Sequence, residues 1–116
     1  MDYQKAMKLS NLADEQVELA REYKTLREKS GLAGMELGVL LSTNINSILK
    51  KKAGAGYDIA VTMLMGENEE AVKLYREQKT NEAKYKGIEK LIETIQSKIS
   101  LEQSNMKYIL RGEGGY

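Results

Sequence analysis

The residues of this chain best suited to chemistry lie in one short stretch, LKKKAGAGYD, which runs from residue 49 to residue 58. Lysine ammonium groups and the backbone amides of glycine-rich turns bind phosphate in many nucleotide sites. The stretch therefore offers one possible anion-binding site, and its residues are Lys50, Lys51, Lys52, Gly54 and Gly56.

The spacing within this stretch favours a connection between two helices over a phosphate loop. A Walker loop requires G-x-x-x-x-G-K-[ST], and that string does not occur. A dinucleotide fingerprint requires a third small residue and a preceding buried strand, whereas a lysine run precedes Gly54. The lysines instead suit a helix C-terminus, either glycine suits a left-handed cap, and Asp58 suits the N-cap of the next helix. An anion patch built from the three lysines is the alternative interpretation.

Other enzymatic chemistry has little support in the sequence. The string SILK at residues 47–50 matches the S-x-x-K of serine acyl-enzymes, but their partner motifs are missing. The chain has no Cys and no His, which excludes thiolate catalysis, disulfides and the usual zinc sites. We therefore expect a protein that is not an enzyme and that holds no metal and no cofactor.

The charge balance and the hydropathy pattern narrow the possible partners and location. Charged residues make up 30% of the chain and nearly cancel, leaving a net charge of +1. Because dedicated nucleic-acid binders usually show a basic excess, binding DNA or RNA would need a patch assembled in three dimensions. The N-terminal segment lacks the apolar core of a secretory signal, and the densest apolar run, GVLL, is too short to span a bilayer. We expect a soluble cytoplasmic protein that does not bind membranes.

The composition and the apolar spacing predict helices throughout. Proline is absent and aromatic residues are only 6% of the chain. Leu12, Leu19 and Leu26 recur every seven residues and predict an amphipathic helix over residues 3–29, ended by the Lys-Ser-Gly at 29–31. Apolar spacing further predicts a helix over residues 32–52 and a short buried helix over residues 57–66.

The clearest pattern covers residues 68–110, where Asn68 and the acids after it predict a helix start. From Ala71 onward, core positions follow at alternating spacings of three and four, and we call this row the seam. Its main members are Leu74, Asn81, Tyr85, Ile88, Ile92, Ile95, Ile99, Met106 and Ile109. Residues 111–116 are expected to form a flexible tail. The prediction is a single all-α domain, residues 1–116, with a long C-terminal heptad helix packed against an N-terminal amphipathic helix and short connecting helices.

The length of the last helix bears on assembly. A continuous helix over residues 68–110 would be about 65 Å long, whereas a compact domain of this size is roughly 35 Å across. Either the helix breaks near Gly87, at a cost of about 1 kcal/mol relative to alanine, or it extends and pairs with the first helix and with another copy. We favour extension, because Gly87 lies outside the seam, and expect a helical-bundle or coiled-coil homo-oligomer. The number of copies and the helix orientation stay open.

Several polar and aromatic side chains have two interpretations. Asn81 either fixes the register of helix pairing or lies where the helix leaves its partner, and for Glu102 we expect a solvated position. The chain has seven tyrosines and no Phe or Trp. Four of the tyrosines have two interpretations: they supply contact area for an interface, or they pack between helices. These four are Tyr57, Tyr75, Tyr85 and Tyr108.

The segments LSNLADEQVELAREYKTLREKSGLAG and NEAKYKGIEKLIETIQSKISLEQSNMKY are short, Cys-free and rich in Lys and Glu. In this style the whole chain resembles the small helical accessory proteins of bacteriophages of Gram-positive bacteria, without a diagnostic motif that would assign functional residues. Such proteins often bind and block a host enzyme or defence factor, or assist phage replication. The resemblance therefore implies a protein that binds another protein in the host cytoplasm, as an inhibitor or adaptor. The alternative function is binding of a nucleotide-like anion or nucleic acid at the basic glycine-rich turn.

Overall fold

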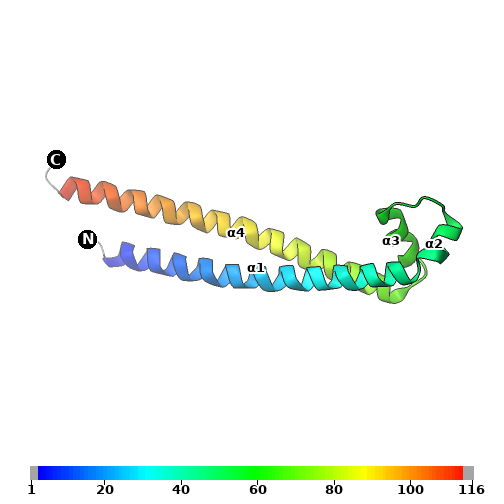
Figure 1. Ribbon diagram of the computed structural model, residues 1–116. Coiled ribbons are helices and arrows are strands. Elements are labelled where there is room, and N and C mark those ends of the chain that lie inside the picture. The colour runs from blue at the N-terminus through cyan, green and yellow to red at the C-terminus, as the bar shows by residue number, and fades with distance from the viewer. Residues whose placement is uncertain (1–2, 114–116) are drawn as a thin grey trace. The chain divides into compact units, whose positions relative to one another are not determined.

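The computed structural model describes the backbone of residues 3–113 and the side chains of residues 3–107. Over this part of the chain the protein is all-helical, as the sequence predicts (Figure 1). The helices are α1 (Tyr3–Thr43), α2 (Ile45–Lys51), α3 (Tyr57–Met65) and α4 (Glu69–Glu113). The chain forms two compact units, one from Met1–Lys24 with Tyr85–Tyr116 and the other from Thr25–Lys84.

The first unit is an antiparallel pair made by the N-terminal part of α1 and the C-terminal part of α4 (Figure 1). Three contacts between the two helices show that they run antiparallel, because the residue numbers in successive contacts rise on α1 and fall on α4. These contacts are an ion pair from Lys8 Nζ to Glu102 Oε1 at 2.9 Å, a hydrogen bond from Gln16 Nε2 to Gln96 Oε1 at 2.8 Å, and an edge-to-face pair of the Tyr23 and Tyr85 rings with centroids 5.5 Å apart.

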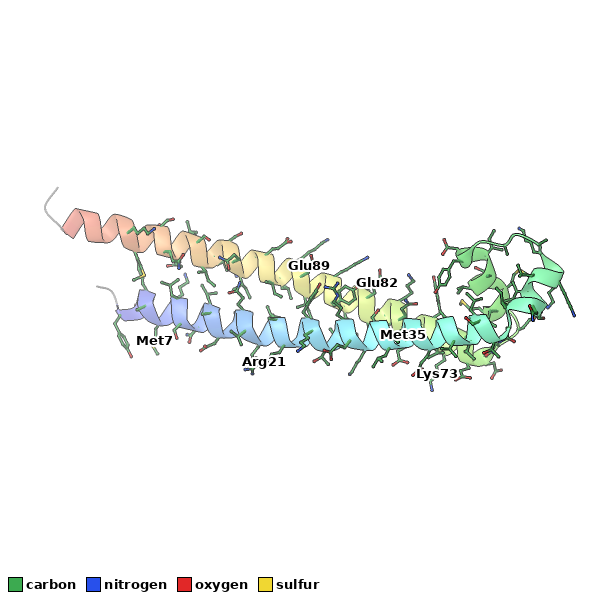
Figure 2. The ribbon with its side chains drawn as sticks, in the orientation of Figure 1. Met7, Arg21, Met35, Lys73, Glu82 and Glu89 are labelled. Carbon is green, nitrogen blue, oxygen red and sulfur yellow. The ribbon has the colours of Figure 1, made fainter. Side chains whose placement is uncertain are left out.

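The apolar contact of the first unit follows the two heptad rows. Leu12 of α1 is buried, as are Ile88 and Ile95 of α4. The outer faces carry solvated residues, and Figure 2 shows Arg21 pointing away from α4 and Glu89 pointing away from α1. Each helix is therefore amphipathic, and its buried face is the apolar heptad row that the sequence predicts.

The second unit has a core to which all four helices contribute. Its buried cluster consists of Leu37 from α1, Ile48 from α2, Ala60, Val61 and Leu64 from α3, and Ala71 and Leu74 from α4. Leu37 is the most deeply buried large side chain of the described part, at 1% exposure. The short helices α2 and α3 gain their stability from this packing, because isolated helices of their length are unstable in water.

The predicted helix end at residues 29–31 is wrong, because α1 continues without interruption from Tyr3 to Thr43. Ser30 is buried, and its hydroxyl donates a hydrogen bond to the backbone oxygen of Gln78 at 3.1 Å. Ala33 and Leu37 extend the buried side of α1 beyond this point. A glycine costs about 1 kcal/mol in a helix interior, and burial of this face outweighs that cost at Gly31.

The predicted helix over residues 32–52 is also wrong, because the chain bends by 64° at Asn44 between α1 and α2. Asn44 Nδ2 donates to the backbone oxygen of Leu40 at 2.8 Å, and Thr43 Oγ1 donates to that of Val39 at 2.9 Å. Side chains that bond to the preceding turn compete with the helical ladder, which gives the bend a local cause. Within the described residues no single helix is long and apolar enough to cross a bilayer, and only α1 and α2 taken together across this bend reach that length and composition.

The short helix α3 and the long helix α4 agree closely with their predicted ranges. Gly87 does not break α4, and nothing lies within 4 Å of the position that a β-carbon would take there. Helix α4 continues to Glu113, so the expected tail is wrong for residues 111–113, while residues 114–116 lie outside the described part. The start is capped as expected, since Asn68 Oδ1 accepts a hydrogen bond from the backbone amide of Ala71 at 3.1 Å.

The seam of α4 is a continuous row of protected side chains. From Ala71 to Met106 every seam position is buried or half-buried, whereas the side chain of Ile109 lies outside the described residues. The predicted pairing with the first helix is confirmed, since α1 packs along α4. The use of the seam between copies of the chain stays a prediction. Glu102 is not solvated as expected, because its side chain is only 12% exposed and pairs with Lys8.

Candidate protein-binding groove

Helices α3 and α4 of the second unit border an open groove made of two adjoining hollows of about 270 Å³ and about 600 Å³. Met65, Tyr75 and Lys79 line both hollows and so connect them. The other lining residues are Tyr57, Asp58, Val61 and Thr62 from α3, and Val72, Arg76, Gln78, Thr80, Ala83 and Lys84 from α4. We refer to this region as the α3–α4 groove.

The groove follows from how α3 and α4 meet the core. Helix α3 buries Val61 and Leu64 in the core. Tyr57 is the first residue of α3, and its side chain is 58% exposed. On α4 the residues Val72 and Tyr75 lie beside the seam and are half-buried. Positions three and four apart share one helix face, so α4 presents an apolar strip next to the strip that packs on the core.

The rim of the groove is mainly cationic. Lys79 Nζ lies 5.6 Å from the centroid of the Tyr75 ring and 3.5 Å from Glu82 Oε2. Among the lining residues, Arg76, Lys79 and Lys84 are basic and only Asp58 is acidic. A groove with an apolar and aromatic floor below a cationic rim complements a segment that has apolar residues on one side and carboxylates beside them.

The tyrosines lie in two different environments of the fold. Tyr85 packs between helices, because its ring contacts Tyr23 edge to face. Tyr57 and Tyr75 instead line the α3–α4 groove, eighteen residues apart in the chain. The sequence leaves both of them open to interface contact or to packing between helices, and no local pattern places them in one groove. Tyr108 lies outside the described side chains.

The basic turn has the geometry of a helix connection. Lys50 and Lys51 lie in the last turn of α2, and its C-cap is Lys52 in an extended conformation, so neither glycine caps this helix directly. Gly54, two residues further on, has a left-handed φ of 75° in the turn that leads to α3. The N-cap of α3 is Gly56 with no side-chain hydrogen bond, so the predicted cap at Asp58 is wrong and Asp58 lies in the first turn.

The anion site predicted at this turn has a competing acid in its own unit. Lys51 forms an ion pair with Glu67, while Lys50 and Lys52 are exposed. The predicted residues are neighbours in the chain, and one of the three cations is already neutralised in part. Anion binding here stays a prediction.

The other routes to a function give no assignment. In the described part of the chain no group of three or more acidic residues is arranged to hold a metal ion. Comparison with known protein families, with curated proteins and with solved structures finds no match. The α3–α4 groove on the surface of the second unit therefore remains the candidate site.

Proposed function

We propose that this chain is a non-enzymatic interaction protein that binds an acidic, amphipathic segment of another protein in the α3–α4 groove. The observation that supports the proposal is the combination of two tyrosines, an apolar floor and three cations in one open groove. Tyrosine and arginine contribute more binding energy per residue at protein interfaces than most other types.

The fold suits such a role because the groove is built on helices that a shared core holds in place. Leu64 of α3 and Ala71 of α4 belong to that core and are 3% and 0% exposed. A preformed surface binds with less loss of conformational entropy than a mobile one. In keeping with the resemblance to phage accessory proteins, we propose that the bound segment belongs to a host protein that the chain inhibits or connects to another factor.

Charge complementarity is the part of the proposal that distinguishes it from anion binding at the basic turn. Rim charges mainly raise the association rate and select partners of opposite sign. Reversal of Arg76 and Lys79 should therefore abolish capture of an acidic partner, while the fold is retained because both side chains are exposed. Reversal of Lys50 and Lys52 should leave the capture unchanged.

A site-specific photocrosslinking experiment in cells tests the proposal. The photoreactive residue replaces Thr80, which lines the groove, or Thr94, an exposed threonine fourteen residues further along α4. Two heptads separate the two positions, so they share a helix face and differ in whether they adjoin the groove. We expect one defined protein to crosslink to the Thr80 probe and not to the Thr94 probe.

The control for this experiment is a second pair of charge reversals. Arg76→Glu with Lys79→Glu should eliminate the crosslinked product, whereas Lys90→Glu with Lys98→Glu, on exposed positions of the same helix, should retain it. Equal capture by both probes, or a product that persists after reversal of the groove cations, would contradict the proposed function.

A further inference from the structure

A second surface of the same unit is apolar and has no covering element among the described residues. Leu32, Met35 and Val39 of α1 are 59%, 70% and 66% exposed. Their spacing of three and four places them on one face of the helix, whereas Ala33 and Leu37 lie on the buried face. Met35 is labelled on α1 in Figure 2. We refer to these three exposed side chains as the α1 stripe.

The α1 stripe borders a shallow hollow on the surface of α1, whose lining also includes Glu36, Gly38, Ser42 and Thr43. Large apolar side chains that stand side by side on a surface usually mark an interaction site. We propose that this stripe pairs with the same stripe of a second copy of the chain, with the two α1 helices antiparallel. This inference does not rest on the proposed function, since it concerns a different surface.

The residues on the two edges of the stripe indicate a second copy as the occupant. One edge carries Lys29 and Glu36, which are one heptad apart, exposed and opposite in charge. No ion-pair partner within the described residues is found for either of them. In an antiparallel pair centred between Leu32 and Met35, each Lys29 faces Glu36 of the partner subunit, so the charge complementarity is reciprocal.

The opposite edge of the stripe has the same symmetry. It carries Gly31 and Gly38, again one heptad apart, and nothing lies within 4 Å of a β-carbon built at either of them. In the same antiparallel pair, each Gly31 faces Gly38 of the partner subunit. Two glycines in facing positions permit close approach of the helix backbones, so that Leu32 contacts Met35 of the partner subunit.

Other arrangements of two copies lose this complementarity. In a parallel pair each edge faces the opposite edge of the partner, so Lys29 and Glu36 would face glycine positions. In an antiparallel pair shifted by one heptad, Glu36 would face Glu36 of the partner subunit, and like charges in facing positions repel. The charge pattern therefore selects both the direction and the register.

The stripe is short, and this limits the expected affinity. Glu28 occupies the next position of the same face on its N-terminal side and faces Val39 of the partner subunit. The contact falls at the small end of protein interfaces, below about 1,200 Å² in total, and we expect a dissociation constant on the order of micromolar. Replacement of Glu28 by Leu should lengthen the apolar contact and tighten the dimer roughly tenfold, which is about 1.4 kcal/mol in total for the two symmetry-related contacts that it adds.

Sedimentation equilibrium with charge-swapped variants tests the inference. In a dimer of the Lys29→Glu variant, a glutamate at position 29 faces Glu36 of the partner subunit in both symmetry-related pairs. In a dimer of the Glu36→Lys variant, Lys29 faces a lysine in both pairs. We expect each variant alone to dimerise at least tenfold more weakly than the natural chain. A one-to-one mixture of the two should form a heterodimer of natural affinity, because both facing pairs are restored. Circular dichroism of each variant establishes that the helices remain folded.

A distance measurement gives an independent readout of direction. The chain has no cysteine, so Ser42→Cys carries a single spin label. The label lies about eight residues from the two-fold axis, and an antiparallel pair separates the two labels by about 25 Å along the helices. A parallel pair in register would bring them to about 10 Å. The long distance is the result expected.

The state of association and the effect of the charge swaps decide the inference. A chain that stays monomeric to several hundred micromolar overturns the inference. A dimer whose affinity is unchanged by either charge swap, or a mixture that fails to restore affinity, also overturns it, because another face or register then holds the copies together. Weakening by both single swaps and recovery in the mixture support it.

Discussion

Leu37→Ala tests whether the four helices of the second unit share one core. The side chain of Leu37 is 1% exposed and packs against buried residues from the other three helices. The change removes three carbon atoms, which corresponds to about 2.4 kcal/mol of transfer free energy at about 0.8 kcal/mol per methylene. Neighbours on separate helices close such a cavity only in part, so a cavity term raises the total loss of unfolding free energy to about 3–4 kcal/mol. The higher helix propensity of alanine offsets only about 0.2 kcal/mol.

Leu101→Ala is the matched control, since it is the same substitution in a helix but at a side chain that is 60% exposed. We expect it to change the unfolding free energy by less than about 0.5 kcal/mol. Urea unfolding followed by circular dichroism at a fixed protein concentration measures both values, because self-association would otherwise shift the midpoint. At roughly 4 °C per kcal/mol for a chain of this length, Leu37→Ala should lower the melting temperature by about 12–16 °C. Equal effects of the two substitutions would refute the shared core.

Three further predictions concern α4. Gly87→Ala should raise the unfolding free energy by about 1 kcal/mol, because Gly87 is exposed within the helix and nothing lies within 4 Å of the added carbon; an unchanged urea midpoint would contradict a continuous α4. Asn68→Ala should lower it by about 1 kcal/mol through loss of the cap to the Ala71 amide, and Asn105→Ala, at an exposed position inside the same helix, should not. Glu102→Leu should stabilise the first unit by about 1 kcal/mol, because it extends the apolar seam. Lys8 loses its ion-pair partner but is already 61% exposed, so its ammonium group is hydrated by water instead. A lower melting temperature would show that the ion pair contributes more than the apolar contact.

The periodicity of α4 could be predicted from the sequence because it is a property of neighbouring residues. Every seam position with a described side chain is protected, from Ala71 to Met106. Periodicity does not say which chain covers a seam, and here α1 of the same chain does so. The expected break at residues 29–31 fails for a related reason. The Lys-Ser-Gly signal is local, whereas the burial of Ser30 depends on Gln78, which is forty-eight residues away in the chain.

The two surfaces on which the proposals rest were harder to predict. The segment of α1 before Asn44 has apolar residues around much of its circumference, so spacing alone cannot separate the buried Leu37 from the exposed Val39. The α3–α4 groove brings Tyr57 and Tyr75 together only after both helices pack on the core. Composition indicates that such tyrosines form contacts, and the fold decides where.

Native mass spectrometry of the protein, purified gently from cells in which it is expressed at its natural level, shows whether the chain works by binding another protein. We predict a complex that contains one additional protein of defined mass, which is absent when Arg76 and Lys79 are replaced by glutamate and present when Lys90 and Lys98 are so replaced. A preparation that instead carries a few hundred daltons of retained small molecule, or a complex that survives reversal of the groove cations, would contradict the account.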